Sequence, residues 1–178
     1  MSDSTLARDI DACCRLTGEF TLRSGQVAGE YFDKYLFESD PALLARVVDR
    51  MLPLLPEGTE LLGGLELGGV PIVTVLSSRT GLPALFVRKK AKEYGTCKLA
   101  EGPAVEGRRV TLVEDVITTG GAVRDATRAL REAGAVVETV VCAIDRSPEG
   151  SNPLDDVGLE VRAVLTKAEL DAASAASD

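Results

Sequence analysis

The chain has 178 residues, of which 45% are hydrophobic and 27% charged, and these values indicate one globular domain with a real core. Its net charge of −8 disfavours a broad nucleic-acid surface, because binding to a phosphate backbone depends on accumulated Lys and Arg. The chain contains no histidine, which excludes Ser-His-Asp, Cys-His and other imidazole mechanisms. Any catalysis must therefore use carboxylates, lysines, hydroxyls or a metal ion.

No apolar run approaches the ~20 residues that a membrane span needs, and the first residues lack the basic and apolar regions of a signal peptide. We therefore expect a cytoplasmic protein without membrane contact. The cysteines show no CxxC spacing, so a structural zinc site is not expected. Free buried thiols are the expected state of Cys13, Cys14 and Cys142, and Cys97 is the fourth cysteine.

Residues 1–58 predict two helices that flank an extended region. In order, the pattern gives a helix from Ser4 to near Gly18, a strand and turn at 20–25, an extended piece with Tyr31 and Phe32, and a helix from Asp40 towards Pro53. Asp40 is a favoured N-cap residue, and proline at the next position suits the first turn.

From residue 59 onwards strands and helices alternate. The expected elements are a strand from Leu61, a glycine-rich loop at 63–69, a helix at 70–80 closed by Gly81, strands at 84–87 and 110–113, a helix at 122–133 before Gly134, and strands at 136–144 and 159–165, the last near an edge. Residues 89–107 interrupt this alternation, and residues 171–178 have nothing to bury. The alternation predicts an α/β fold with a central, mostly parallel sheet flanked by helices, which binds ligands at the carboxyl ends of its strands.

The segment 110–123 carries the strongest functional signal. Four residues suited to a buried strand lead into Glu114 and Asp115, then into two threonines and two glycines that open a helix. Main-chain N–H groups at such a helix start can hold a phosphate, and glycines let the backbone close around it. The two carboxylates would repel that anion, so they suit sugar hydroxyls or a divalent cation. The segment therefore predicts a cradle for a phosphorylated sugar.

The same segment lacks two well-known phosphate-binding motifs. It is not of the Walker type, because no Gly-Lys-Ser/Thr follows, and it lacks the GxGxxG of dinucleotide folds. The plain alternative is a strand-to-helix turn whose acidic pair faces solvent.

A basic cluster follows the strand at 84–87. It contains Arg88, Lys89, Lys90 and Lys92 within an otherwise acidic chain. A charge run is usually a solvated loop. Here four cations within five residues repel one another unless an anion is present, and a diphosphate is a suitable anion.

These motifs resemble those of the phosphoribosyltransferases. Segment 110–123 is similar to the family's motif for phosphoribosyl diphosphate (PRPP), and the run from Arg88 to Gly95 is similar to the mobile catalytic loop of orotate phosphoribosyltransferases. Further similar stretches are 20–25, 64–71 and the pair Asp145-Arg146, so the resemblance covers most of the chain. It implies a type I phosphoribosyltransferase fold with a small N-terminal hood at 1–58, a PRPP-binding core at 59–166, a flexible loop at 88–107 and a tail at 171–178.

The resemblance also implies the site residues. Asp115, Glu114 and Lys92 would be catalytic. PRPP would be bound by Arg88, Lys89, Lys92, Tyr94, Glu114, Asp115, Val116, Ile117, Thr118, Thr119, Gly120, Gly121 and Ala122, with its diphosphate on Glu66, Leu67, Gly68 and Gly69. Orotate would contact Thr118, Arg146 and Arg23. Taken alone, Arg23 would be a surface cation and Arg146 a routine partner of Asp145.

The implied reaction joins orotate and PRPP to give orotidine 5′-phosphate and diphosphate, a step of pyrimidine (UMP) synthesis. Mg²⁺ would be the cofactor, bound mainly through substrate and water with no direct protein ligand. The partners would be these substrates and a second copy of the chain, whose loop reaches into the neighbouring site. The alternatives are a transferase for another base and a PRPP-sensing regulator that binds RNA or DNA.

Three positions depart from the family pattern. Tyr94 stands where many relatives have His, and Leu67-Gly68 stands where some have Tyr-Lys. Glu114 replaces an Asp, which keeps the charge and changes the reach.

Overall fold

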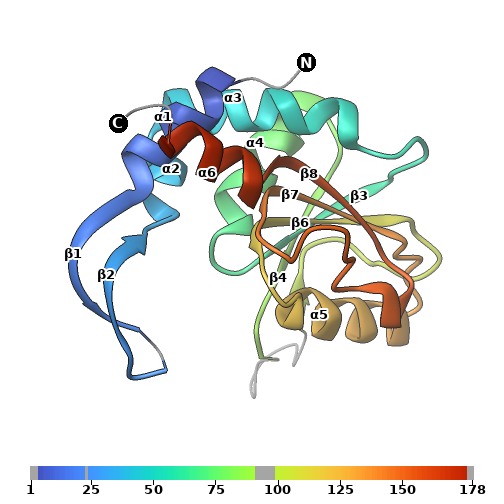
Figure 1. Ribbon diagram of the computed structural model, residues 1–178. Coiled ribbons are helices and arrows are strands. Elements are labelled where there is room, and N and C mark those ends of the chain that lie inside the picture. The colour runs from blue at the N-terminus through green and yellow to red at the C-terminus, as the bar shows by residue number, and fades with distance from the viewer. Residues whose placement is uncertain (1–3, 23, 91–98, 176–178) are drawn as a thin grey trace.

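The computed structural model, which describes residues 4–22, 24–90 and 99–175, is built around a six-stranded sheet (Figure 1). The strand order is β5-β4-β3-β6-β7-β8, in which β5 is antiparallel to β4 and every other neighbouring pair is parallel. The bounds are Leu61–Leu65 for β3, Ala84–Val87 for β4, Ala100–Glu101 for β5, Val110–Ile117 for β6, Thr139–Asp145 for β7 and Glu160–Thr166 for β8. The prediction of a mostly parallel sheet is confirmed, with the last strand at an edge.

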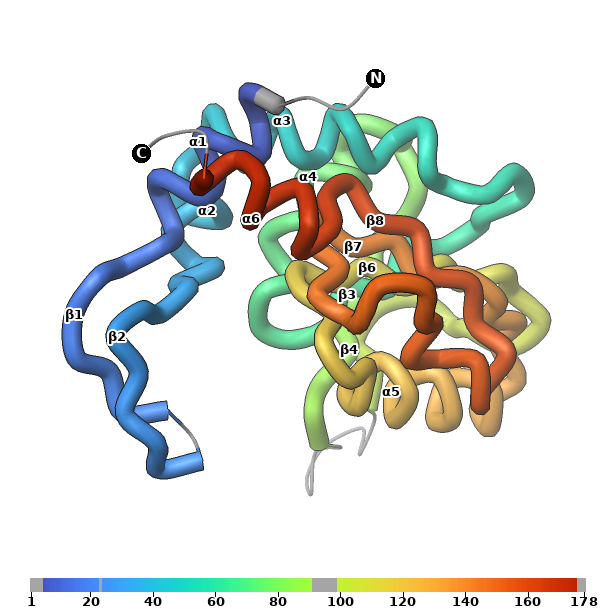
Figure 2. Tube along the Cα trace, in the orientation of Figure 1, coloured from blue at the N-terminus to red at the C-terminus, as the bar shows by residue number. Residues whose placement is uncertain are grey.

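Helices cover both faces of this sheet (Figure 2). One face carries α5 (Gly121–Glu132), whose Val123, Ala126 and Leu130 share a core with strand residues such as Leu112 and Val140. The helices that share the other core with Val113 and Val141 are α1 (Ser4–Cys14), α3 (Pro41–Met51), α4 (Gly69–Thr80) and α6 (Lys167–Ala175), together with Phe37 of the short helix α2 (Tyr35–Ser39). The first and last helices of the described chain therefore stabilise the same face.

A two-stranded hairpin extends away from this body (Figure 1). Its strands are β1 (Arg15–Thr21) and β2 (Val27–Phe32), and the Phe20 and Tyr31 rings lie 5.5 Å apart on it. The first helix therefore ends at Cys14 rather than near Gly18. Residues 15–21 pair with β2 instead of continuing the helix, which is a tertiary contact that local periodicity does not reveal.

Local capping signals were reliable. The Asp40 carboxylate accepts hydrogen bonds from the N–H groups of Ala42 and Leu43, at 2.8 and 3.0 Å, and Pro41 is the first residue of α3. Gly81 ends α4 with φ = 74°, a left-handed conformation that favours glycine. Both helices lie where the sequence predicted them.

Several boundaries differ from the prediction. β3 continues through Gly63 and Gly64, and β6 continues through the acidic pair to Ile117. A Cβ on Gly64 would collide with Val73 of α4, so Gly64 serves close helix-to-sheet packing rather than a loop. The short elements α2 (Tyr35–Ser39), η1 (Leu52–Leu54), η2 (Asp155–Val157) and β5 were not predicted. β5 also places part of the expected loop 88–107 in the sheet.

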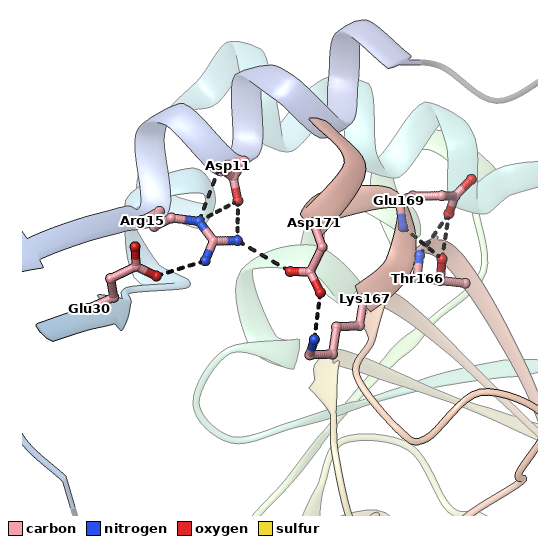
Figure 3. Close-up of polar contacts among 7 residues, drawn as sticks. All are labelled: Asp11, Arg15, Glu30, Thr166, Lys167, Glu169 and Asp171. Atoms are coloured by element: carbon pink, nitrogen blue, oxygen red, sulfur yellow. Dashed lines mark hydrogen bonds and ion pairs between the residues drawn. The ribbon is translucent and has the colours of Figure 1, made fainter. Parts of the chain in front are cut away.

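The C-terminal segment is also a correction. Residues 171–175, expected as a tail with nothing to bury, belong to α6, whose Leu170 is buried. Arg15 joins this helix to the N-terminal region, because its guanidinium contacts Asp11, Glu30 and Asp171 (Figure 3). Asp171 in turn pairs with Lys167 at 2.5 Å. These ion pairs and the packing of Leu170 hold the segment against the body.

The thiols follow the prediction in part. Cys14 and Cys142 are buried free cysteines, Cys13 is half-buried, and Cys97 lies outside the described residues. None of the helices in residues 4–22, 24–90 and 99–175 has the length and apolar character needed to cross a membrane.

Candidate active site

The carboxyl ends of four parallel strands bring the predicted site residues to one edge of the sheet. Residues 66–69 connect β3 to α4, Arg88 and Lys89 follow β4, residues 118–120 connect β6 to α5, and Arg146 follows β7. This edge, called the rim below, is where open parallel sheets bind ligands.

The acidic pair lies on β6 itself and is buried. Asp115 has 0% of its surface exposed and Glu114 8%. The Asp115 N–H donates to the Glu114 carboxyl at 3.0 Å, and the Val116 N–H donates to Asp115 Oδ1 at 2.5 Å. The alternative of a solvent-facing pair at a turn is therefore wrong.

Two residues from the N-terminal region close over Asp115. Lys34, just before α2, places its Nζ 2.5 Å from Asp115 Oδ2. Glu38 of α2 is 6% exposed, and neither of its carboxyl oxygens has a hydrogen-bond donor in the described part of the chain. Neither residue was predicted from the sequence. A usable signal existed in Glu38, a carboxylate that directly follows the apolar run Leu36-Phe37.

The two members of the acidic pair have opposite protonation tendencies. Burial raises the pKa of Glu114 to about 9, and the neighbouring Asp115 charge adds to this rise. Burial alone would also raise the pKa of Asp115, but hydrogen bonds with Glu114 and Lys34 hold it below its usual value. These opposite shifts favour a neutral Glu114 beside an ionised Asp115, whereas the sequence pattern alone suggested two charged carboxylates. Such a division of roles is common in catalytic carboxylate pairs.

We expect thermal stability to fall as the pH rises, because Glu38 holds a proton in the folded protein. Burial raises its pKa from 4.5 to about 8, so between these values the folded state binds more protons than the unfolded state. The free energy of unfolding then decreases with rising pH, and Glu114 acts in the same direction. The measurement is the melting temperature of wild type and Glu38→Gln across this window. Glu38→Gln should flatten the slope, and an unchanged slope would contradict the assignment.

The loop 66–69 packs directly against Asp115. A Cβ built on Gly68 would overlap the Asp115 carboxylate and lie 2.8 Å from Glu38 Oε1. Its φ of −66° suits any residue, so Gly68 is required for space and not for conformation. The Leu67 side chain beside it is exposed, and the Glu66 to Leu67 peptide bond is cis.

Gly68→Ala should therefore displace the Asp115 carboxylate and lower stability together. Overpacking a closed site typically costs ~1–3 kcal/mol, and displacement of Asp115 should reduce kcat/KM by roughly tenfold or more. Gly29→Ala is the matched control, because a Cβ there meets nothing within 4 Å. Steady-state kinetics and melting curves of the two variants decide this. Equal behaviour of both variants would show that the Gly68 contact is unimportant.

The loop after β6 has the features of an anion cradle. The Thr118 and Thr119 side chains are exposed, while Gly120 is buried with φ = 72° as the N-cap of α5. A Cβ on Gly120 would collide with Leu154. Gly121 and Ala122 form the exposed first turn of α5, so its N–H groups and helix dipole are available to an anion.

The basic segment after β4 contacts the loop 66–69. The Lys89 N–H donates to Glu66 Oε1, and the Arg88 guanidinium pairs with Glu101 of β5 at 3.4 Å. Both residues line a cavity of about 560 Å³ together with Glu66 and Ala122. In this structure the Arg88 side chain is thus paired with β5, while the Lys89 backbone lies at the rim.

Arg146 occupies the neighbouring part of the rim. Its N–H donates to the Ile117 carbonyl at 2.7 Å, and its guanidinium lies over the Phe32 ring, 5.4 Å from the centroid. It lines a cavity of about 600 Å³ with Ser147, Thr166 and Lys167. The Asp145 carboxylate instead accepts from the Ser147 N–H at 2.9 Å. The alternative of Arg146 as a routine partner of Asp145 therefore has no support in the described contacts.

Three predicted residues lie outside the described residues: Arg23, Lys92 and Tyr94. Within residues 4–22, 24–90 and 99–175, no group of three or more His, Cys, Asp or Glu side chains could hold a metal ion. An individual carboxylate such as Asp115 can still offer one oxygen to a metal ion.

A parallel sheet whose rim combines a buried acidic pair, a helix-start anion cradle and a glycine loop defines the phosphoribosyltransferase class of α/β proteins. In agreement, the family described as "Phosphoribosyl transferase domain" matches residues 57–164, more than half of the chain. The orotate phosphoribosyltransferase of Nocardioides sp. is 80% identical over 171 residues, which cover 96% of both chains. The chain belongs to the orotate phosphoribosyltransferase family.

Solved structures agree with this assignment. The Mycobacterium tuberculosis H37Rv orotate phosphoribosyltransferase in complex with Fe(III) dicitrate has a TM-score of 0.83 and 32% identity, with 96% of this chain and 99% of that chain covered. The same enzyme in complex with PRPP has a TM-score of 0.77 and 29% identity over the same shares. The fold class and enzyme class expected from the sequence are confirmed.

Proposed function

We propose that this enzyme transfers the ribose 5-phosphate group of PRPP to orotate at the rim, with Asp115 at the centre of the site. The observation that carries this proposal is the buried Asp115, paired with Lys34, between the glycine loop at Gly68 and the anion cradle that follows β6. Displacement at the anomeric carbon passes through a state with oxocarbenium character, as in glycoside cleavage. A fixed negative charge beside the ribose favours that state.

The parts of PRPP match different segments of the rim. The 5′-phosphate is an anion that suits the exposed Thr118 and Thr119 hydroxyls and the first turn of α5. The ribose hydroxyls suit Asp115 and Glu114, because a neutral Glu114 can donate a hydrogen bond while an ionised Asp115 accepts one. The diphosphate suits the main chain of residues 66–69 and the cations that follow β4.

Orotate suits the Arg146 region. A guanidinium binds a carboxylate through paired, charge-assisted hydrogen bonds, and the adjoining cavity of about 600 Å³ has room for a pyrimidine. Phe32 lies next to Arg146 and offers an aromatic face to the base. Thr118 lies on the same rim, at the end of the neighbouring strand β6. Arg23 is proposed as a further contact on sequence grounds alone.

Mg²⁺ fits this donor set as an ion held by substrate. It prefers oxygen ligands, keeps several waters and is typically bound through one or two carboxylates plus substrate phosphates. Asp115 is the ionised member of the acidic pair on the rim, and it would contact the ion through water. When bound, Mg²⁺ would neutralise the charge of the leaving diphosphate.

PRPP binding without any base tests the site directly. We expect calorimetry with PRPP and Mg²⁺ to show saturable binding that Asp115→Asn weakens. Binding of orotate but not of PRPP to the folded protein would contradict the proposed site.

We also propose a cytoplasmic homodimer in which Lys92 of one subunit serves the site of the other. Mixing inactive Lys92→Ala protein with inactive Asp115→Asn protein should then restore activity, because a hybrid dimer has one site with both residues intact. The assay is orotate turnover after subunit exchange, which is followed by mass-tagged subunits. Exchange without any recovery would show that the loop acts within its own subunit.

A further inference from the structure

The Lys34 and Asp115 pair is unlike the other ion pairs of the described chain, because one partner is a buried residue of the proposed reaction centre. The Asp115 side chain is 1% exposed, whereas the Lys34 side chain is 34% exposed and reaches inward from the turn before α2. The ion pair therefore connects the N-terminal region to the middle of the sheet.

The charges that face Asp115 come from three elements. Lys34 approaches from the turn before α2, Glu38 from α2, and Glu114 from β6. Gly68 fills the remaining side without a side chain. Lys34 is the cation in this set, and the two carboxyls are held neutral by burial at neutral pH.

An ionised carboxylate that is removed from water is unstable without a counter-charge. Removing one partner of a buried ion pair is strongly destabilising, because the other charge stays behind unpaired. Lys34 therefore has two effects on Asp115: it keeps the carboxylate charged, and it fixes the position of Oδ2. The ammonium group has three donors, so it can hold Oδ2 while a substrate hydroxyl donates to the same carboxylate.

We propose that Lys34 is a positioning residue for the transferase reaction, which holds the Asp115 carboxylate in place and oriented towards the ribose of PRPP. This inference rests on the role proposed above for Asp115. Because Lys34 directly precedes α2, it also makes the geometry of the reaction centre depend on how the N-terminal region packs against the sheet.

The experiment compares Lys34→Met, which keeps the stem and removes the charge, with Lys34→Arg, which keeps the charge. We expect Lys34→Met to lower kcat/KM for PRPP by roughly tenfold to a hundredfold, as misplaced catalytic groups do. Its acid limb in the pH profile should move to higher pH, since Asp115 loses the charge that lowers its pKa. Lys34→Arg should restore most of the activity and the wild-type profile.

Arg109→Met is the matched control at the other end of β6. Arg109 pairs with Glu138 at 3.4 Å, and both side chains are well exposed, so this change should leave the kinetics unaltered. A Lys34→Met enzyme with wild-type kcat/KM and pH profile would overturn the inference. So would a folded Lys34→Arg enzyme that is no better than Lys34→Met.

The double variant Lys34→Met/Asp115→Asn covers the case in which Lys34→Met does not fold, because it replaces the ion pair by two neutral side chains. If Lys34 acts through Asp115, the double variant should be no slower than Asp115→Asn alone. Additive losses would overturn the inference. A harmless Asp115→Asn would instead refute the proposed role of Asp115, so the two failures are distinguishable.

Discussion

Asp115→Asn should reduce kcat by on the order of a hundredfold or more, the largest single effect expected at this site. The change keeps the size of the side chain and removes the charge that stabilises an oxocarbenium-like state, and several kcal/mol of lost transition-state binding correspond to such a factor. Stability should change less, since an amide still fits between Lys34 and Gly68 and the Lys34 side chain left without its partner is 34% exposed to water. Steady-state kinetics and melting curves measure the two effects separately.

Asp49→Asn provides the control for this variant. Asp49 pairs with Arg79 at 3.6 Å, and about half of each side chain is exposed, so its charge should not influence turnover. Near-wild-type turnover of Asp115→Asn with normal PRPP affinity would show that the carboxylate has another role.

Arg146→Ala should raise the KM for orotate strongly while PRPP binding stays nearly intact. Loss of a desolvated, charged hydrogen-bond partner typically costs ~2–5 kcal/mol. The effect should be specific to orotate, because Arg146 and the proposed PRPP cradle lie at the ends of different strands. Arg146 follows β7, beside Phe32 and the cavity of about 600 Å³, whereas the anion cradle follows β6.

The conservative variant Arg146→Lys separates charge from geometry. Lysine keeps the charge but cannot form the paired hydrogen bonds of a guanidinium. The KM of Arg146→Lys for orotate should therefore lie between those of wild type and Arg146→Ala. Each substrate is titrated separately at saturating levels of the other. Equal losses for orotate and PRPP would indicate a structural role for Arg146 and reopen the choice of base.

The sequence predicted helices and strands correctly where a local signal, such as a helix cap, also marks the boundary in the folded structure. Helix α3 begins at its Asp40 cap, α4 ends at Gly81, and β4 spans Ala84–Val87 as expected. The prediction was wrong where long-range packing decides. Arg15–Thr21 pairs with β2 although it follows a helix, and α6 forms because Leu170 and Asp171 meet the distant N-terminal region.

The candidate site shows the same division. Contiguous motifs located residues 66–69, 114–122 and Arg146 on one rim, because parallel strands end at the same edge. Lys34 and Glu38 were missed, since they reach Asp115 from about 80 positions earlier in the chain and only the folded structure brings them together. The neutral state of Glu114 was missed as well, because its pKa depends on burial that a sequence pattern does not quantify.

Orotate turnover tests the account most directly. The purified protein is mixed with orotate, PRPP and Mg²⁺, and the loss of orotate's ultraviolet absorbance is recorded. We expect a decrease that requires all three additions, is accompanied by orotidine 5′-phosphate and diphosphate, and is nearly abolished by Asp115→Asn. A folded, PRPP-binding protein that leaves the orotate absorbance unchanged, or that consumes uracil or a purine base instead, would contradict it.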